Sequence, residues 1–142
     1  MSAPLRERLA TLGRTLAQRE QEHSAGLAEA WEHAHALREV VAEGLEGFET
    51  AIREAAAPQL AVELGPVRTD EKHVRSVEFE VMRGRHRALV IVKSRGEVTL
   101  VGPFRTGKAE GPCQSVAWDD RAEVLATLAP FLERFLEEAA TP

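Results

Sequence analysis

The sequence predicts an α+β fold with a long N-terminal helix or helical hairpin, a four- to five-stranded antiparallel meander sheet and a C-terminal helix packed on one face. Three observations lead to this prediction. Residues 4–57 have a helical apolar period and no proline after Pro4, residues 58–118 change to a period of two, and residues 120–136 return to the helical period. We therefore expect a helical oligomerisation or interaction segment at 1–57 and one compact α+β domain at 58–142.

The N-terminal segment is rich in Ala, Leu, Glu, Arg and Gln, all of which favour helices. Its apolar residues recur at spacings of three and four, so one side of the helix is apolar along most of its length. This stripe consists of Leu5, Leu9, Leu12, Leu16, His23, Leu27, Ala30, Ala34, Leu37, Val41, Leu45, Phe48, Ile52 and Ala55. Ser24 and Gly26 offer a turn, so a hairpin stays open as an alternative. One continuous helix is favoured because the stripe passes these residues without losing phase.

The length of such a helix implies a partner. Residues 4–57 would span about 80 Å at 1.5 Å per residue, whereas the rest of the chain forms a body about 25–30 Å across. The body cannot cover the whole stripe, so we expect a homo-oligomer with an interface that contains Leu5, Leu9, Leu12, Leu16, Leu27 and Trp31. The average step along the stripe is about 3.6 residues, which favours antiparallel helix packing over a long, regular two-stranded coiled coil.

The middle of the chain is predicted to form β-strands. Alternating apolar residues predict strands at 60–64 and 76–81, and the continuous apolar run 88–92 predicts a central strand that is covered on both faces. A short turn at 94–96 leads to a strand at 98–101, and residues 115–118 are expected to add an edge strand.

The last helix begins with Asp120 and Glu123, whose spacing is that of a capping box. We expect Pro130 to kink this helix or divide it, and residues 137–142 to fray.

Composition narrows the class of protein. The single cysteine, Cys113, excludes an internal disulfide and suits a reducing compartment. No apolar run approaches the roughly 20 residues that a bilayer requires, and the N-terminus lacks the apolar core of a signal peptide. We expect a cytoplasmic protein with no membrane association.

Two short motifs suggest chemistry, but their context argues against it. Residues Gly102 to Lys108 match the spacing of a phosphate-binding loop, yet Ala109 supplies no hydroxyl and Pro112 would break the required helix. The pairs Glu20 with His23 and Glu32 with His35 have a metal-bundle spacing but lie about 18 Å apart on one straight helix. We therefore expect no catalytic residue, no metal, no cofactor and no enzymatic activity.

Basic side chains gather in the middle of the chain, where residues 58–118 carry ten Lys/Arg and seven Asp/Glu. The candidates are Arg83, Arg85, Arg87, Lys93, Arg95, Arg105 and Lys108. The leading hypothesis is a non-enzymatic protein-interaction or adaptor module that self-associates through its N-terminal helix, with another protein as a further candidate partner. The alternative is an anion- or nucleic-acid-binding domain that uses these basic residues. The net charge of −5 and the lack of a recognised motif argue against nucleic acid.

Overall fold

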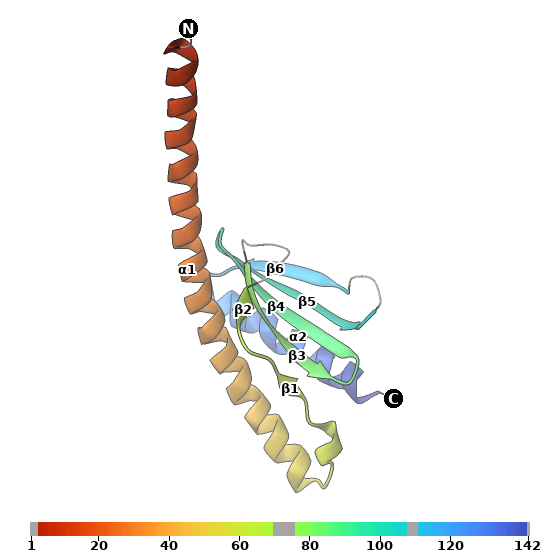
Figure 1. Cartoon of the computed structure of the whole chain (residues 1–142). Helices are drawn as coiled ribbons and strands as arrows, with labels where there is room; N and C mark the ends of the chain where they lie inside the picture. The colour runs from red at the N-terminus through yellow and green to blue at the C-terminus, as the bar shows by residue number, and fades with distance from the viewer. Residues whose placement is uncertain (1–2, 70–75, 108–110, 142) are drawn as a thin grey trace.

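The computed structural model describes residues 3–69, 76–107 and 111–141, and it confirms the predicted α+β fold (Figure 1). The elements are α1 (Ala3–Glu54), the short 3-10 helix η1 (Pro58–Leu60), β1 (Glu63–Leu64), β2 (Arg68–Thr69), β3 (Ser76–Arg83), β4 (His86–Lys93), β5 (Glu97–Arg105), β6 (Cys113–Ala117) and α2 (Arg121–Ala140).

The N-terminal segment is one continuous helix and not a hairpin. Gly26 lies in its interior, where a glycine is needed for close packing and not for a turn. A Cβ atom at this position would stand 2.5 Å from the carbonyl oxygen of Ser94, in the turn between β4 and β5. Nearby, Nδ1 of His23 lies 3.4 Å from Oγ of Ser94. These contacts mark the point at which α1 leaves the body.

The strands form an antiparallel sheet in the order β1-β3-β4-β5-β6, with β2 also paired to β3. In its register Phe79 pairs with Val90, and Val90 pairs with Leu100. Alternate residues therefore point to one apolar face, as the period of two predicts. The buried residues of this face are Val77, Phe79, Val81, Ala88, Val90, Val92, Val98 and Leu100.

Both helices pack on this apolar face. α1 contacts β3 and β4, and α2 contacts β4, β5 and β6. The small side chains of Ala30 and Ala34, which are fully buried, let α1 approach the strands closely, while Phe131 and Phe135 of α2 fill the space over the other half of the sheet. The result is a two-layer body with one hydrophobic core.

The prediction that the central strand is covered on both faces is wrong. β4 is central, but Leu89 and Ile91 on its second face are only half-buried, and neither described helix lies over that face. Neighbouring strands supply the partial shielding. The predicted strand at 60–64 is also shorter than expected, because only Glu63 and Leu64 pair with β3.

The C-terminal helix begins as predicted, since Oδ1 of Asp120 accepts a hydrogen bond from the backbone N–H of Glu123 at 3.1 Å. It runs without division through Pro130 to Ala140, so the expected division at Pro130 is wrong, and residues 137–140 are helical where fraying was expected. Packing of Leu128, Phe131 and Phe135 on the sheet outweighs the local effect of the proline. A hydrogen bond that Arg83 donates to the carbonyl of Ala139 holds the end of the helix.

Candidate interaction surface

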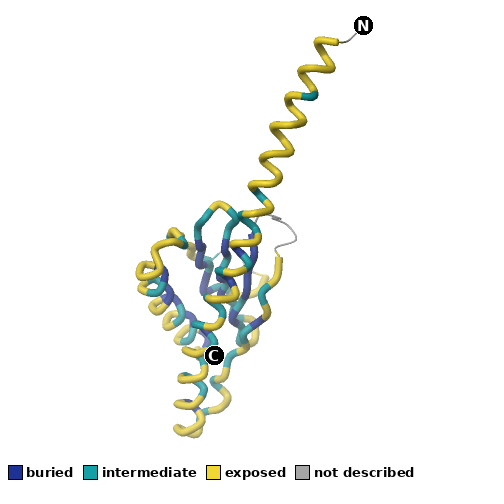
Figure 2. The backbone as a smooth tube through the Cα atoms, turned by 90° about the vertical axis from the view of Figure 1, so that its left-hand side faces the viewer, coloured by how far each residue is buried: buried dark blue, intermediate teal, exposed yellow. Residues whose placement is uncertain are grey.

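The most prominent unpaired feature of the molecule is the first part of α1. We call residues 3–22 the projecting segment, because every residue in it is exposed except the half-buried Ala10 (Figure 2). At 1.5 Å per residue it extends about 30 Å beyond the body. Leu5, Leu9, Leu12 and Leu16 retain 55%, 58%, 49% and 50% exposure, and these are large hydrophobic residues that cores and interfaces usually bury.

The four leucines form one row along the projecting segment. Their spacings of four, three and four residues place them on a single side of the helix. The other two predicted interface residues are separated from this row, since Leu27 and Trp31 pack, half-buried, against the core of their own chain. Of the six predicted interface residues, the four of the leucine row therefore lie together on an exposed surface.

The predicted basic cluster is divided between the two ends of the sheet. Arg83, Arg85 and Arg87 lie around the β3–β4 turn with Arg105 beside them, because His86 pairs with Arg105 in the register. Lys93 and Arg95 lie at the opposite end of β4, about 20 Å away at 3.3 Å per residue. Lys108 lies outside the described residues.

Most of these cations already have partners within the chain. Arg83 donates hydrogen bonds to the carbonyl of Gln59 at 3.2 and 3.0 Å as well as to Ala139. Arg87 donates to the carbonyls of Gly84 and His86 at 2.6 and 3.0 Å. Such bonds use the N–H groups that would otherwise grip an anion.

At the other end of the sheet, Glu97 accepts hydrogen bonds from Arg95 at 2.7 Å and from Lys93 at 3.2 Å. The hydrogen bond from Arg95, which has the largest effect, and the hydrogen bond from Lys93 together lower the pKa of the Glu97 carboxyl below its ordinary value. Among the six described candidates, Arg85 and Arg105 are the exposed cations for which no side-chain partner is found in the described part of the chain.

The two sequence motifs acquire structural roles. Gly102 to Arg105 of the phosphate-loop pattern belong to β5, and the next described element is β6, another strand. Of the four residues in the Glu-x-x-His pairs, His23 contacts Ser94 and His35 stacks on Trp31 with ring centroids 5.5 Å apart. In the described ranges no group of three His, Cys, Asp or Glu side chains is arranged to hold a metal.

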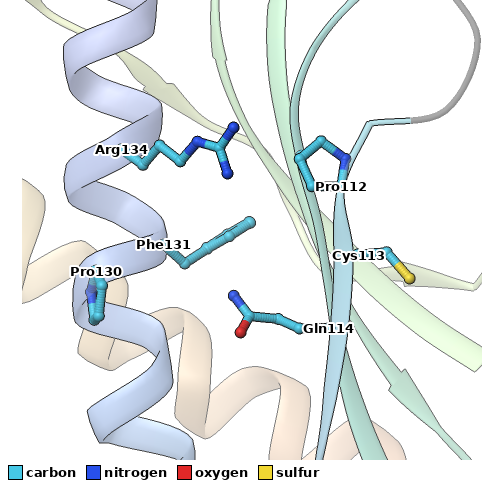
Figure 3. A pocket seen from close by; sticks show the side chains of 7 residues that line it. Pro112, Cys113, Gln114, Pro130, Phe131 and Arg134 are labelled. Carbon is cyan, nitrogen blue, oxygen red and sulfur yellow. The ribbon is translucent and has the colours of Figure 1, made fainter.

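A surface pocket of about 380 Å³ lies between α2 and the start of β6 (Figure 3). Arg134 and Gln114 extend toward it on either side of Phe131, whereas the side chain of Cys113 points away. Nε of Arg134 donates to Glu138 at 3.2 Å, so its charge is already partly balanced. Cys113 is free and exposed. Among the described residues that line the pocket there is no nucleophile paired with a base and no second cation.

Sequence reasoning did not identify the contact between Gly26 and Ser94, which fixes where the projecting segment begins. The two residues are distant in sequence, and a glycine close to Ser24 is, from the sequence alone, typical of a turn.

No protein family, curated protein or solved structure matches this chain. Neither described helix combines the length and the apolar character needed to cross a membrane.

Proposed function

We propose that this chain is a non-enzymatic interaction module that self-associates through the projecting segment. The observation that carries the proposal is the row of four half-exposed leucines on a helix that leaves the body. Apolar surface of this kind, continuous and placed on a regular element, is typical of protein–protein interfaces. A second protein that presents an apolar helix face is a further candidate partner for the same row.

The energy available from covering this row is substantial. About half of each leucine side chain is in water, so the row corresponds to roughly two fully exposed leucines, or about 3–6 kcal/mol per chain. A pair of chains would recover about twice that amount. This gain is of the order of the 4–15 kcal/mol that association costs in lost freedom of motion, before further contacts are included.

The helix itself also gains from a partner. Helices shorter than about 12–15 residues are marginal in water, and a solvated end of a longer helix frays in the same way. The projecting segment propagates from the anchored part of α1, so nucleation is already complete, but no tertiary contact from the described part of the chain protects its backbone hydrogen bonds. Association would supply that protection.

Anion or nucleic-acid binding through the basic residues is the less favoured function. Arg83, Arg87, Lys93 and Arg95 are engaged within the chain, and the candidates occupy two separate ends of the sheet. Arg85 and Arg105 remain as a small exposed pair. The exposed free thiol of Cys113 suits a reducing compartment, and we propose a cytoplasmic location on this ground.

Self-association is tested with charged residues placed on the leucine row. The variant Leu12→Asp with Leu16→Asp should be a monomer at micromolar concentration, whereas the unmodified protein should be at least a dimer by light scattering or sedimentation equilibrium. The matched control is Gln18→Asp with Gln21→Asp, which adds the same charges on the opposite side of the helix and should leave the mass unchanged. A monomeric unmodified protein would refute the proposal.

A further inference from the structure

The projecting segment has a local pattern that differs from the average of the whole stripe. Leu5, Leu9, Leu12 and Leu16 follow alternating steps of four and three, which is the spacing of the apolar a and d positions in a heptad repeat. In this scheme Leu9 and Leu16 occupy a positions, and Leu5 and Leu12 occupy d positions. The same phase places Arg19 at the next d position and His23 at the next a position.

The charged residues beside the leucine row are sorted along the segment. The flanking e and g positions hold Arg6 and Arg8 near the N-terminal end and Glu20 and Glu22 near the body, with the uncharged Gly13 and Thr15 between them. In the described part of the chain no ion pair engages any of these four charged residues. One end of the surface is therefore basic and the other acidic.

We propose that the occupant of the leucine row is the projecting segment of a second copy of this chain, packed antiparallel with the two-fold axis near Arg14. This inference rests on the proposed self-association and specifies its orientation and register. In this arrangement Leu12 faces Leu16 of the second copy, and each basic end meets an acidic end. Arg6 lies beside Glu20 of the second copy and Arg8 beside Glu22, which gives four opposite-charge contacts across the pair.

The length of the segment agrees with this register. When residue 14 is level with residue 14 of the second copy, residue 5 lies opposite residue 23 of that copy, where α1 begins to contact its own body at Ser94. Each projecting segment is then covered along its whole length of about 30 Å. The N-terminal end of one copy stops at the β4–β5 turn of the other, so the two bodies lie at opposite ends of the helix pair.

A parallel arrangement of the two segments leaves the charges unmatched. It brings Arg6 and Arg8 of both copies to the same end of the pair, and Glu20 and Glu22 of both copies to the other end. Like charges then approach at both ends, which opposes assembly.

An antiparallel pair shifted by one heptad also loses the charge pairing. It would set Leu5 against Leu16 and Leu9 against Leu12, so all four leucines would meet one another, whereas in the proposed register Leu5 faces His23 and Leu9 faces Arg19 of the second copy. In that register, however, residues 6 and 8 would lie beside the uncharged residues 13 and 15 of the second copy, which form no ion pair. The shift would also leave the residues near the body uncovered.

The register is tested by reversing the charges. Arg6→Glu with Arg8→Glu should raise the dimer dissociation constant by about tenfold or more at low salt, because four attractive contacts become repulsive. Acidic residues near a helix N-terminus favour the helix, so weaker assembly would not reflect a weaker helix. Adding Glu20→Arg and Glu22→Arg to the same chain should restore the dissociation constant to within about threefold of the unmodified value.

Mixing the unmodified chain with this fourfold variant separates the orientations. In the antiparallel pair a mixed dimer sets Arg6 of the unmodified chain beside the Glu20→Arg substitution of the variant, so like charges meet. The two chains should therefore sort into separate homodimers. The fourfold variant has the same composition and mass as the unmodified chain, so one of the two is labelled with a heavy nitrogen isotope before native mass spectrometry. In a parallel pair mixed dimers are favoured, and their dominance would overturn the inference. If the unmodified protein is a dimer and Arg6→Glu with Arg8→Glu leaves its dissociation constant unchanged, the register is wrong but self-association stands. If the unmodified protein is a monomer, self-association itself is refuted.

Discussion

The close approach of α1 to the sheet at Gly26 gives a prediction whose size follows from the structure. A Cβ atom at this position would stand 2.5 Å from the carbonyl oxygen of Ser94, and the contacting atom belongs to the backbone, which cannot rotate away. Relieving the overlap requires α1 or the β4–β5 turn to shift by roughly 1 Å, and overpacking of this kind costs about 1–3 kcal/mol.

The substitution Gly26→Ala also brings a gain, because alanine favours a helix over glycine by about 0.8–1.0 kcal/mol. Gly44→Ala is the matched control, since Gly44 lies in the same helix and a Cβ atom there would meet nothing within 4 Å. The two substitutions receive the same gain, so the difference between their free energies of unfolding isolates the overlap. We expect Gly26→Ala to be less stable than Gly44→Ala by about 1–3 kcal/mol.

Urea unfolding followed by circular dichroism measures this difference, with the protein concentration held constant because association raises apparent stability. Gly44→Ala should be more stable than the unmodified protein. Equal stability of the two variants would show that α1 is not held against the β4–β5 turn as the structure describes. It would also remove the reason for placing the start of the projecting segment at this point.

Two further predictions concern the sheet and α2. Glu97→Gln should lower the free energy of unfolding by up to about 1 kcal/mol at pH 7, since it removes the carboxylate that Arg95 and Lys93 contact. Because the folded-state pKa of Glu97 is lowered, its contribution is present above the ordinary pKa and is lost as pH falls through the folded value. The two proteins should therefore converge in acid, and an undiminished difference at pH 2–3 would contradict this cause. Pro130→Ala should raise stability by about 1–3 kcal/mol, because Pro130 is exposed and the substitution restores a backbone donor inside α2. An unchanged or lower midpoint of thermal unfolding would contradict this prediction.

The elements with a strong period were predictable from the sequence. The stripe of α1 and the alternation in β3 each extend over enough residues to define the element and its buried face. The apolar run of β4 defines a central strand but does not show which of its faces is buried. β2 was not predicted and β1 was predicted too long, because each is a pair of residues whose strand character depends on pairing with β3. The continuity of α2 likewise depends on tertiary packing, which local signals such as Pro130 do not report.

The candidate surface was predictable in part for a related reason. The exposed leucines followed from a comparison of helix length with body size, which needs no contact information. The hydrogen-bond partners of the basic residues could not be predicted in this way. Arg83 donates to the carbonyls of Gln59 and Ala139, which are 24 and 56 residues away along the chain. The cluster of basic residues in the sequence therefore predicted more unpaired positive charge than the structure has. The row of leucines predicted an exposed apolar surface correctly.

The unbroken path of α1 relates the interface to the body. At 100° per residue, Ala30, Ala34, Val41 and Ile52 lie within roughly 20° of the direction of Leu5, so the leucine row faces the same way as the stripe that packs on the sheet. A second helix on that row continues the layer that the sheet begins. In the proposed antiparallel pair, each helix therefore fills the space above the β4–β5 turn of the other copy. The stripe then remains covered from Leu5 to Ile52, first by the second copy and then by the chain's own sheet.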